Sequence, residues 1–204
     1  MNWRILLTVA AAAMTCCAWA QAQNVTWTET FDDNVDGWLT ETYSSVVHSP
    51  LDANGSGTSG SAEVANFHPS NNNGLGIRKC VTVDVTAGDL YIYGGAMFIP
   101  TGQTETGKAM VGLRWYDGVE CSGSQVGSQP RLQNLVLGLW VALHSTTQEA
   151  PAGAVSVIFV AFPSKVEAGG TLVSNFDNLF FVSDEVFSDG FESADTDRWS
   201  AVTP

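Results

Sequence analysis

The sequence has few basic residues. Its 204 residues include 8 Lys and Arg against 21 Asp and Glu, a net charge of −13. Nucleic acids and anionic lipids are bound through positive surface that displaces counterions, so this balance argues against both as partners. An acidic surface suits divalent cations, or it serves solubility alone, and composition does not decide between the two.

Patterns of catalysis are also missing. The three histidines, His48, His68 and His144, lie far apart and form no His-x-x-x-His pair. The sequence has no Gly-x-Ser-x-Gly elbow and no phosphate-binding glycine loop between a strand and a helix. Carboxylates for a glycosidase pair are present, but nothing selects two of them. We therefore expect a protein that is not an enzyme.

No apolar run reaches the roughly 20 residues that span a bilayer. The longest, at residues 5–13, follows Arg4 and precedes small residues around Ala20, which is the pattern of a secretory signal peptide over residues 1–22. A lipoprotein would use Cys16 or Cys17, but Met14-Thr15 fits that cleavage pattern poorly. We expect a bacterial protein without a membrane span that is secreted, periplasmic or on the cell surface.

Two of the four cysteines, Cys80 and Cys121, remain after cleavage of the signal peptide. In an exported protein such a pair is most simply a disulfide. The alternative is a metal-binding or catalytic thiol, and neither cysteine has a Cys or His at ligand spacing. We therefore predict that Cys80 and Cys121 pair.

Helical periodicity is almost absent after the signal peptide. Short segments rich in Val, Thr, Tyr and Phe alternate with Gly, Asn, Ser and Pro clusters, which predicts an all-β, two-sheet β-sandwich over residues 24–183. The predicted strands are 25–31, 38–48, 61–67, 76–85, 89–99, 108–116, 131–143, 154–162 and 172–182. Residues 184–204 form a separate acidic tail.

The strand predicted at 108–116 has two distinct faces. Ala109, Val111, Leu113 and Trp115 form its apolar side, so Arg114 and Tyr116 are expected to point outward. Trp38, Trp115 and Trp140 are assigned to the core.

Carboxylates occur in two places that point to a cation. The strand at 25–31 runs into the acidic loop 32–37, and Asp177 lies within the apolar strand 172–182. A buried, unpaired carboxylate is costly, so we expect the two segments to meet around a cation. The loop also matches the first half of an EF-hand, but Tyr43 at the twelfth position cannot supply the required bidentate carboxylate.

Several motifs together resemble a known group of folds. They are Phe31-Asp32 leading to Trp38, Cys80-Val81-Thr82-Val83 with Gly88 and Tyr91, the segment 111–116 before Cys121-Ser122-Gly123, Trp140, the segment 150–154, and Phe176-Asp177-Asn178-Leu179. In order and spacing they resemble the galactose-binding-like jelly rolls, which include cellulose- and xylan-binding modules of secreted bacterial glycoside hydrolases. The tail resembles a Phe-Glu to Trp-Ser ending of secreted proteobacterial proteins.

The resemblance implies a structural calcium near the first and last strands. Its acidic ligands would fall on Asp32 and Asp177, with Glu29 as the alternative to Asp32, because Asp stands where the family usually has Glu.

The resemblance also makes a non-catalytic carbohydrate-binding module the sharpest functional hypothesis, with a polysaccharide or other glycan as partner. Aromatic faces stack on sugar rings while charged and amide groups orient hydroxyls. The candidate ligand-binding residues are Tyr116, Arg114, Tyr43 and Asn72. The rival hypothesis is an extracellular structural or adhesion module without a sugar site. In either case we expect a monomer.

Overall fold

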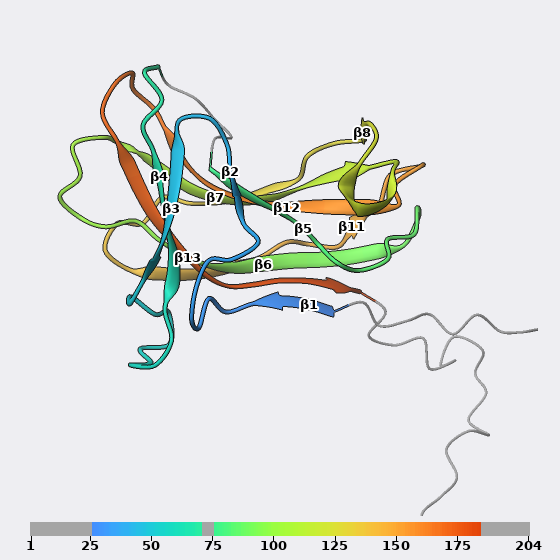
Figure 1. Ribbon diagram of the computed structural model, residues 1–204, viewed down its shortest axis with the longest axis horizontal. Coiled ribbons are helices and arrows are strands. Elements are labelled where there is room, and N and C mark those ends of the chain that lie inside the picture. Colours follow the sequence, from blue (N-terminus) through green and yellow to red (C-terminus); the bar gives the residue numbers. More distant parts are fainter. Residues whose placement is uncertain (1–25, 71–75, 185–204) are drawn as a thin grey trace, which may run out of the picture.

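The protein is described here by a computed structural model covering residues 26–70 and 76–184. Two antiparallel sheets face each other, as the sequence predicts (Figure 1). The predicted signal peptide, Asn72 and nearly all of the tail lie outside the described residues. No helix in the described ranges is long and apolar enough to cross a membrane.

The first sheet has seven strands and includes both the first and the last strand of the described chain. The strands are β1 (Thr26–Glu29), β3 (Ser44–Ser49), β4 (Ser61–Asn66), β6 (Leu90–Phe98), β10 (Trp140–His144), β11 (Gln148–Glu149) and β13 (Leu172–Ser183). Their order is β10-β6-β13-β4-β3, with β1 paired to β13 and β11 paired to β6. The two ends of the domain are thus neighbours in one sheet.

The second sheet has six strands. They are β2 (Leu39–Thr40), β5 (Ile77–Cys80), β7 (Gly107–Tyr116), β8 (Gln125–Val126), β9 (Arg131–Asn134) and β12 (Ser156–Lys165). Their order is β2-β5-β12-β7-β8, and β9 also pairs with β7. A short 3-10 turn at Val119–Cys121 follows β7.

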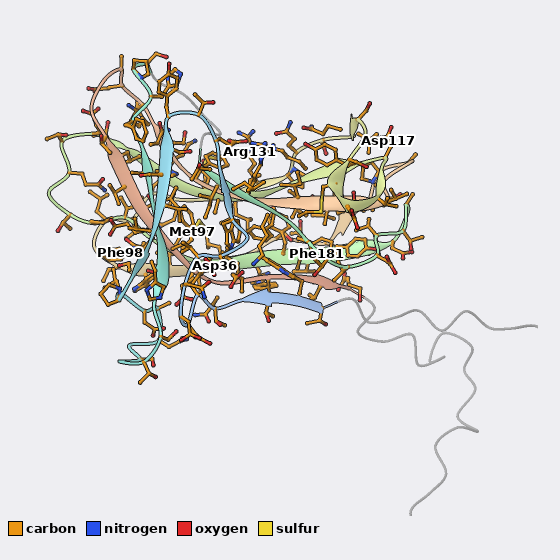
Figure 2. All side chains as sticks on the ribbon, in the orientation of Figure 1. Asp36, Met97, Phe98, Asp117, Arg131 and Phe181 are labelled. Carbon is orange, nitrogen blue, oxygen red and sulfur yellow. A yellow bond between two sulfur atoms is a disulfide. The ribbon has the colours of Figure 1, made fainter. Side chains whose placement is uncertain are left out.

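Aromatic side chains fill the space between the sheets. Phe159 of β12 is fully buried, with its ring centroid 5.3 Å from that of Trp27 and 6.1 Å from that of Tyr93. Figure 2 shows Phe181 of β13 between the two sheets, where its ring stacks on Tyr91 at 4.8 Å. β12 is buried along its whole length, because its outward side chains are also covered.

Two predicted strands are interrupted where the chain crosses from one sheet to the other. The segment 38–48 splits into β2 and β3 around Tyr43, whose φ of 64° lies in the left-handed region. The segment 131–143 splits into β9 and β10, with the side chain of Asn134 bonded to the backbone of Val136 in the intervening loop. The alternation of apolar and polar residues continues while the chain changes sheet, so the sequence alone does not reveal the crossing.

Trp140 does not belong to the core, contrary to the prediction, because of the second crossing. Trp38 and Trp115 are core residues, as predicted. Trp140 instead is half-buried on the outer side of β10, with its ring 5.4 Å from that of Phe98. Because β10 begins a new strand in the seven-stranded sheet, Trp140 faces away from the core.

Candidate functional site

The outward side of β7 lies where the sequence predicts it. Ala109, Val111, Leu113 and Trp115 are buried between the sheets. Arg114 and Tyr116 are half-buried on the opposite side. Successive side chains of a strand point to opposite faces, so the outer face of the six-stranded sheet carries these two candidate residues together.

An apolar layer lies on this outer face. Met110, Ile158, Val160 and Phe162 form a second buried cluster, separate from the main core, and Tyr116 packs against it. All four are nearly inaccessible to solvent because longer side chains cover them.

Three arginines share this outer face with the cluster, and one of them, Arg131, lies over Phe162. We call the surface formed by Arg78, Arg114 and Arg131 the arginine face. Arg78 of β5 pairs with Val160, Val160 pairs with Gly112, and Gly112 pairs with Arg131 of β9, so these residues form one row across four strands. Arg114 pairs with Ile158 in the neighbouring row. Paired residues share a face, so all three arginines point outward.

Each arginine is held differently. Arg114 Nη1 donates to Glu41 Oε1 at 2.6 Å, and both side chains of this ion pair are only about one-sixth exposed. The Arg131 guanidinium lies 5.3 Å from the centroid of the Phe162 ring, and its Nη2 donates to Gln129 Oε1. Figure 2 shows Arg131 on the side of the sheet away from β6. Arg78 Nε is buried and has no hydrogen-bond partner in the described chain.

Tyr43 lies apart from this surface. It is 45% exposed, and its ring makes edge contacts with His68 at 4.7 Å and Phe67 at 6.4 Å. Asn72 is outside the described residues. The structure therefore brings Arg114 and Tyr116 together and leaves Tyr43 in a separate aromatic group.

Sequence reasoning missed Arg78, Arg131 and Glu41 as members of this surface. Arg78 and Arg131 lie in predicted strands, but strand pairing and register decide that they share a face with Arg114. Glu41 reaches Arg114 from the turn between β2 and β3, 73 residues away in sequence. The one sequence signal for this surface is the scarcity of basic residues, which makes each arginine of this acidic chain a candidate binding residue.

Asp177 lies in β13 and is 1% exposed. Its carboxylate accepts the backbone N–H groups of Ala53 at 2.9 Å and Asn178 at 2.6 Å. Burial raises the pKa of Asp177 most, and the charges of Asp52 and Asp32 raise it further against the lowering effect of the two amides. Asp32 and Asp177 are thus close enough to repel each other.

Glu29, the alternative ligand, is engaged elsewhere. Its Oε2 accepts from Lys79 Nζ at 2.5 Å and from Trp38 Nε1 at 3.2 Å. No group of three or more Asp, Glu, His or Cys side chains within residues 26–70 and 76–184 is placed to hold a metal ion. A calcium here would need oxygen ligands from the backbone and water in addition to Asp177 and Asp32.

The predicted disulfide is present. Cys80, at the end of β5, is bonded to Cys121, which follows β7, and their Cα atoms are 5.8 Å apart. The bond fastens the loop after β7 beside the arginine face, and Cys121 packs against the outer apolar cluster.

The seven-stranded sheet carries a hollow that the sequence patterns do not predict. It has a volume of about 570 Å³ and lies on the outer face of the seven-stranded sheet. Its floor is formed by residues with small side chains or none, namely Gly95, Ala96 and Ala142. Trp140 and Phe180 also line it. Asn54, His144 and Asn178 supply its polar groups. The volume suits a small molecule, whereas the arginine face is an open surface that crosses several strands.

Comparison with known proteins places the fold. No family model matches the chain, and no curated protein matches it. Among solved structures, the C-terminal family 22 carbohydrate-binding module of Clostridium thermocellum Xyn10B superposes with a TM-score of 0.55 at 17% identity, over 79% of this chain and 94% of that one. The chain shares the jelly-roll fold of this module.

Two further structures agree. The CBM22-1 xylan-binding domain of Paenibacillus barcinonensis Xyn10C gives a TM-score of 0.54 at 14% identity, over 80% of this chain and 97% of that one. An arabinose-bound GH51 α-L-arabinofuranosidase gives 0.57 at 16% identity, over 76% of this chain but only 25% of that one. The match thus covers nearly the whole of the two carbohydrate-binding modules and a quarter of the arabinofuranosidase chain.

Proposed function

We propose that this protein is an exported, non-catalytic carbohydrate-binding module whose arginine face binds a polysaccharide. The observation that carries the proposal is the set of outward Arg78, Arg114, Arg131 and Tyr116 side chains over an apolar layer that crosses the six-stranded sheet. The jelly-roll fold, shared with a xylan-binding domain, supports it.

The chemistry of this surface suits sugars. Guanidinium N–H groups donate hydrogen bonds in a fixed fork, which matches the hydroxyls and carboxylates of a sugar chain. The half-buried ring of Tyr116 offers an apolar face beside them. A row across four strands, at about 4.8 Å per strand, gives an extended ligand about 14 Å of contact.

We test the proposal by affinity electrophoresis of the purified protein in gels containing soluble plant or bacterial polysaccharides. Retardation in at least one gel is expected. Arg114→Ala or Tyr116→Ala should weaken it about tenfold, because each removes about 1–2 kcal/mol of contact. Unchanged melting temperatures would show that the variants fold.

Trp140→Ala is the matched control for location. This variant changes the hollow on the seven-stranded sheet and leaves the arginine face intact. Loss of retardation in Trp140→Ala alone would move the site to the hollow. No retardation of the wild-type protein in any gel would favour the structural or adhesion hypothesis.

The proposal includes a structural calcium. Asp177 and Asp32 would bind it, together with backbone and water oxygens, because two mutually repelling carboxylates near a buried position are stabilised by a cation. Glu29 is left out of the ligand set because Lys79 already neutralises it. The ion would join the loop after β1 to β13 and would take no part in sugar chemistry.

A further inference from the structure

The basic residues of this acidic protein are unevenly distributed. The described residues contain six Lys and Arg: Arg78, Lys79, Lys108, Arg114, Arg131 and Lys165. All three of these arginines are on the arginine face, and Lys108 lies on the same outward side of β7, four residues before Gly112. The positive charges that an anionic ligand could meet are therefore gathered on one surface of an otherwise acidic chain.

Two of the three arginines lack a carboxylate partner in the described chain. The ion pairs there are Lys79 with Glu29 and Arg114 with Glu41. Arg131 bonds to the neutral Gln129 and lies over Phe162. Arg78 has a buried Nε without a hydrogen-bond partner. The Nε atom is out of reach of a ligand, but Arg78 as a whole is only half-buried and has no carboxylate partner among the described residues, so a carboxylate from outside would pair with the terminal Nη groups of its guanidinium.

Resting on the proposed function, we propose that the glycan bound by the arginine face is acidic and that its uronate carboxylates pair with Arg78 and Arg131. A planar carboxylate accepts two parallel N–H bonds from a guanidinium, which a neutral hydroxyl cannot reproduce. Arg114 is already neutralised by Glu41 and orients sugar hydroxyls.

The distance between Arg78 and Arg131 and the net charge of the protein limit which acidic glycans can bind. Arg78 and Arg131 are three strand spacings apart, about 14 Å between backbones, so they meet different sugar units of one extended chain. The net charge of −13 repels polyanions such as nucleic acid at long range, and the pairing of uronate carboxylates with Arg78 and Arg131 offsets that repulsion locally.

The test compares the binding of each acidic polymer with the binding of the same polymer after its carboxylates have been removed. Polygalacturonate and glucuronoxylan are immobilised in parallel with their carboxyl-reduced forms, in which each uronate becomes a neutral sugar. We expect at least one native polymer to bind about tenfold more tightly than its reduced form, with the difference shrinking as salt is raised. Arg78→Gln and Arg131→Gln should each remove most of that difference, and Arg131→Lys should retain part of it.

Lys79→Gln is the control, because it removes one positive charge on the other side of β5. It should leave the difference between native and reduced polymers unchanged. Equal binding of native and reduced polymers would overturn this inference while leaving the proposed function standing. Equal affinity for dextran sulfate would overturn the carboxylate assignment, and absence of binding to every polymer would overturn both proposals.

Discussion

Asp177 is the residue whose chemistry departs most from that of an ordinary surface carboxylate. Its pKa is raised, chiefly by burial, so the folded state binds its proton more tightly than the unfolded state does. Its contribution to stability is complete below the ordinary pKa of 3.8 and is lost as pH rises through the folded value.

We therefore predict that, in chelator, the wild-type protein loses stability as pH rises above the ordinary carboxyl pKa of 3.8, while Asp177→Asn loses less. At pH 7 calcium should make the wild-type protein more stable than Asp177→Asn. It adds about 2.7 kcal/mol to the unfolding free energy of the wild type at a hundredfold excess over Kd and little to that of the variant. Thermal unfolding with and without chelator measures both effects. A wild-type melting curve that is the same in calcium and in chelator would contradict the calcium proposal.

The disulfide joins two elements of the six-stranded sheet, because it ties the end of β5 to the turn after β7. With a sequence separation of 41 residues, the bond should stabilise the fold by about 4 kcal/mol on the chain-entropy account. The Cys80→Ala/Cys121→Ala variant should lose about that amount in urea unfolding. Non-reducing mass spectrometry of protein that begins after the predicted signal peptide should find no free thiol in the wild type, and two alkylatable thiols would contradict the pairing.

β12 is the element on which both apolar layers depend. Its Phe159 packs in the main core, whereas Phe162 belongs to the cluster below the arginine face. Phe159→Ala should cost about 3–5 kcal/mol of unfolding free energy, since it opens a cavity among Trp27, Trp38 and Tyr93. Denaturant unfolding measures this cost, with Phe159→Leu as the volume-conserving control. A loss below about 1 kcal/mol would contradict the packing described here.

At the scale of the whole molecule, local patterns predict the sandwich but not the pairing of its strands. The alternation of Ala109, Val111, Leu113 and Trp115 correctly indicates which side of β7 is buried. The chain crossings at Tyr43 and after Asn134 were missed, because the apolar period continues while the chain changes sheet. Trp140 was assigned to the core for that reason.

The candidate site was predictable only in part, for the same physical reason. Arg114 and Tyr116 follow from the alternation of one strand. Arg78 and Arg131 join them through the register of β5, β12, β7 and β9, which depends on contacts distant in sequence. The electrostatic character of the surface is therefore a property of the assembled sheet.

A broad glycan array probed with the purified protein in the presence of calcium tests most directly whether the arginine face binds a polysaccharide. We expect binding to at least one polysaccharide, with acidic plant or bacterial glycans giving the strongest signals and the Arg114→Ala variant giving a weaker signal on the same spots. A folded protein that binds no glycan on the array would contradict the proposal.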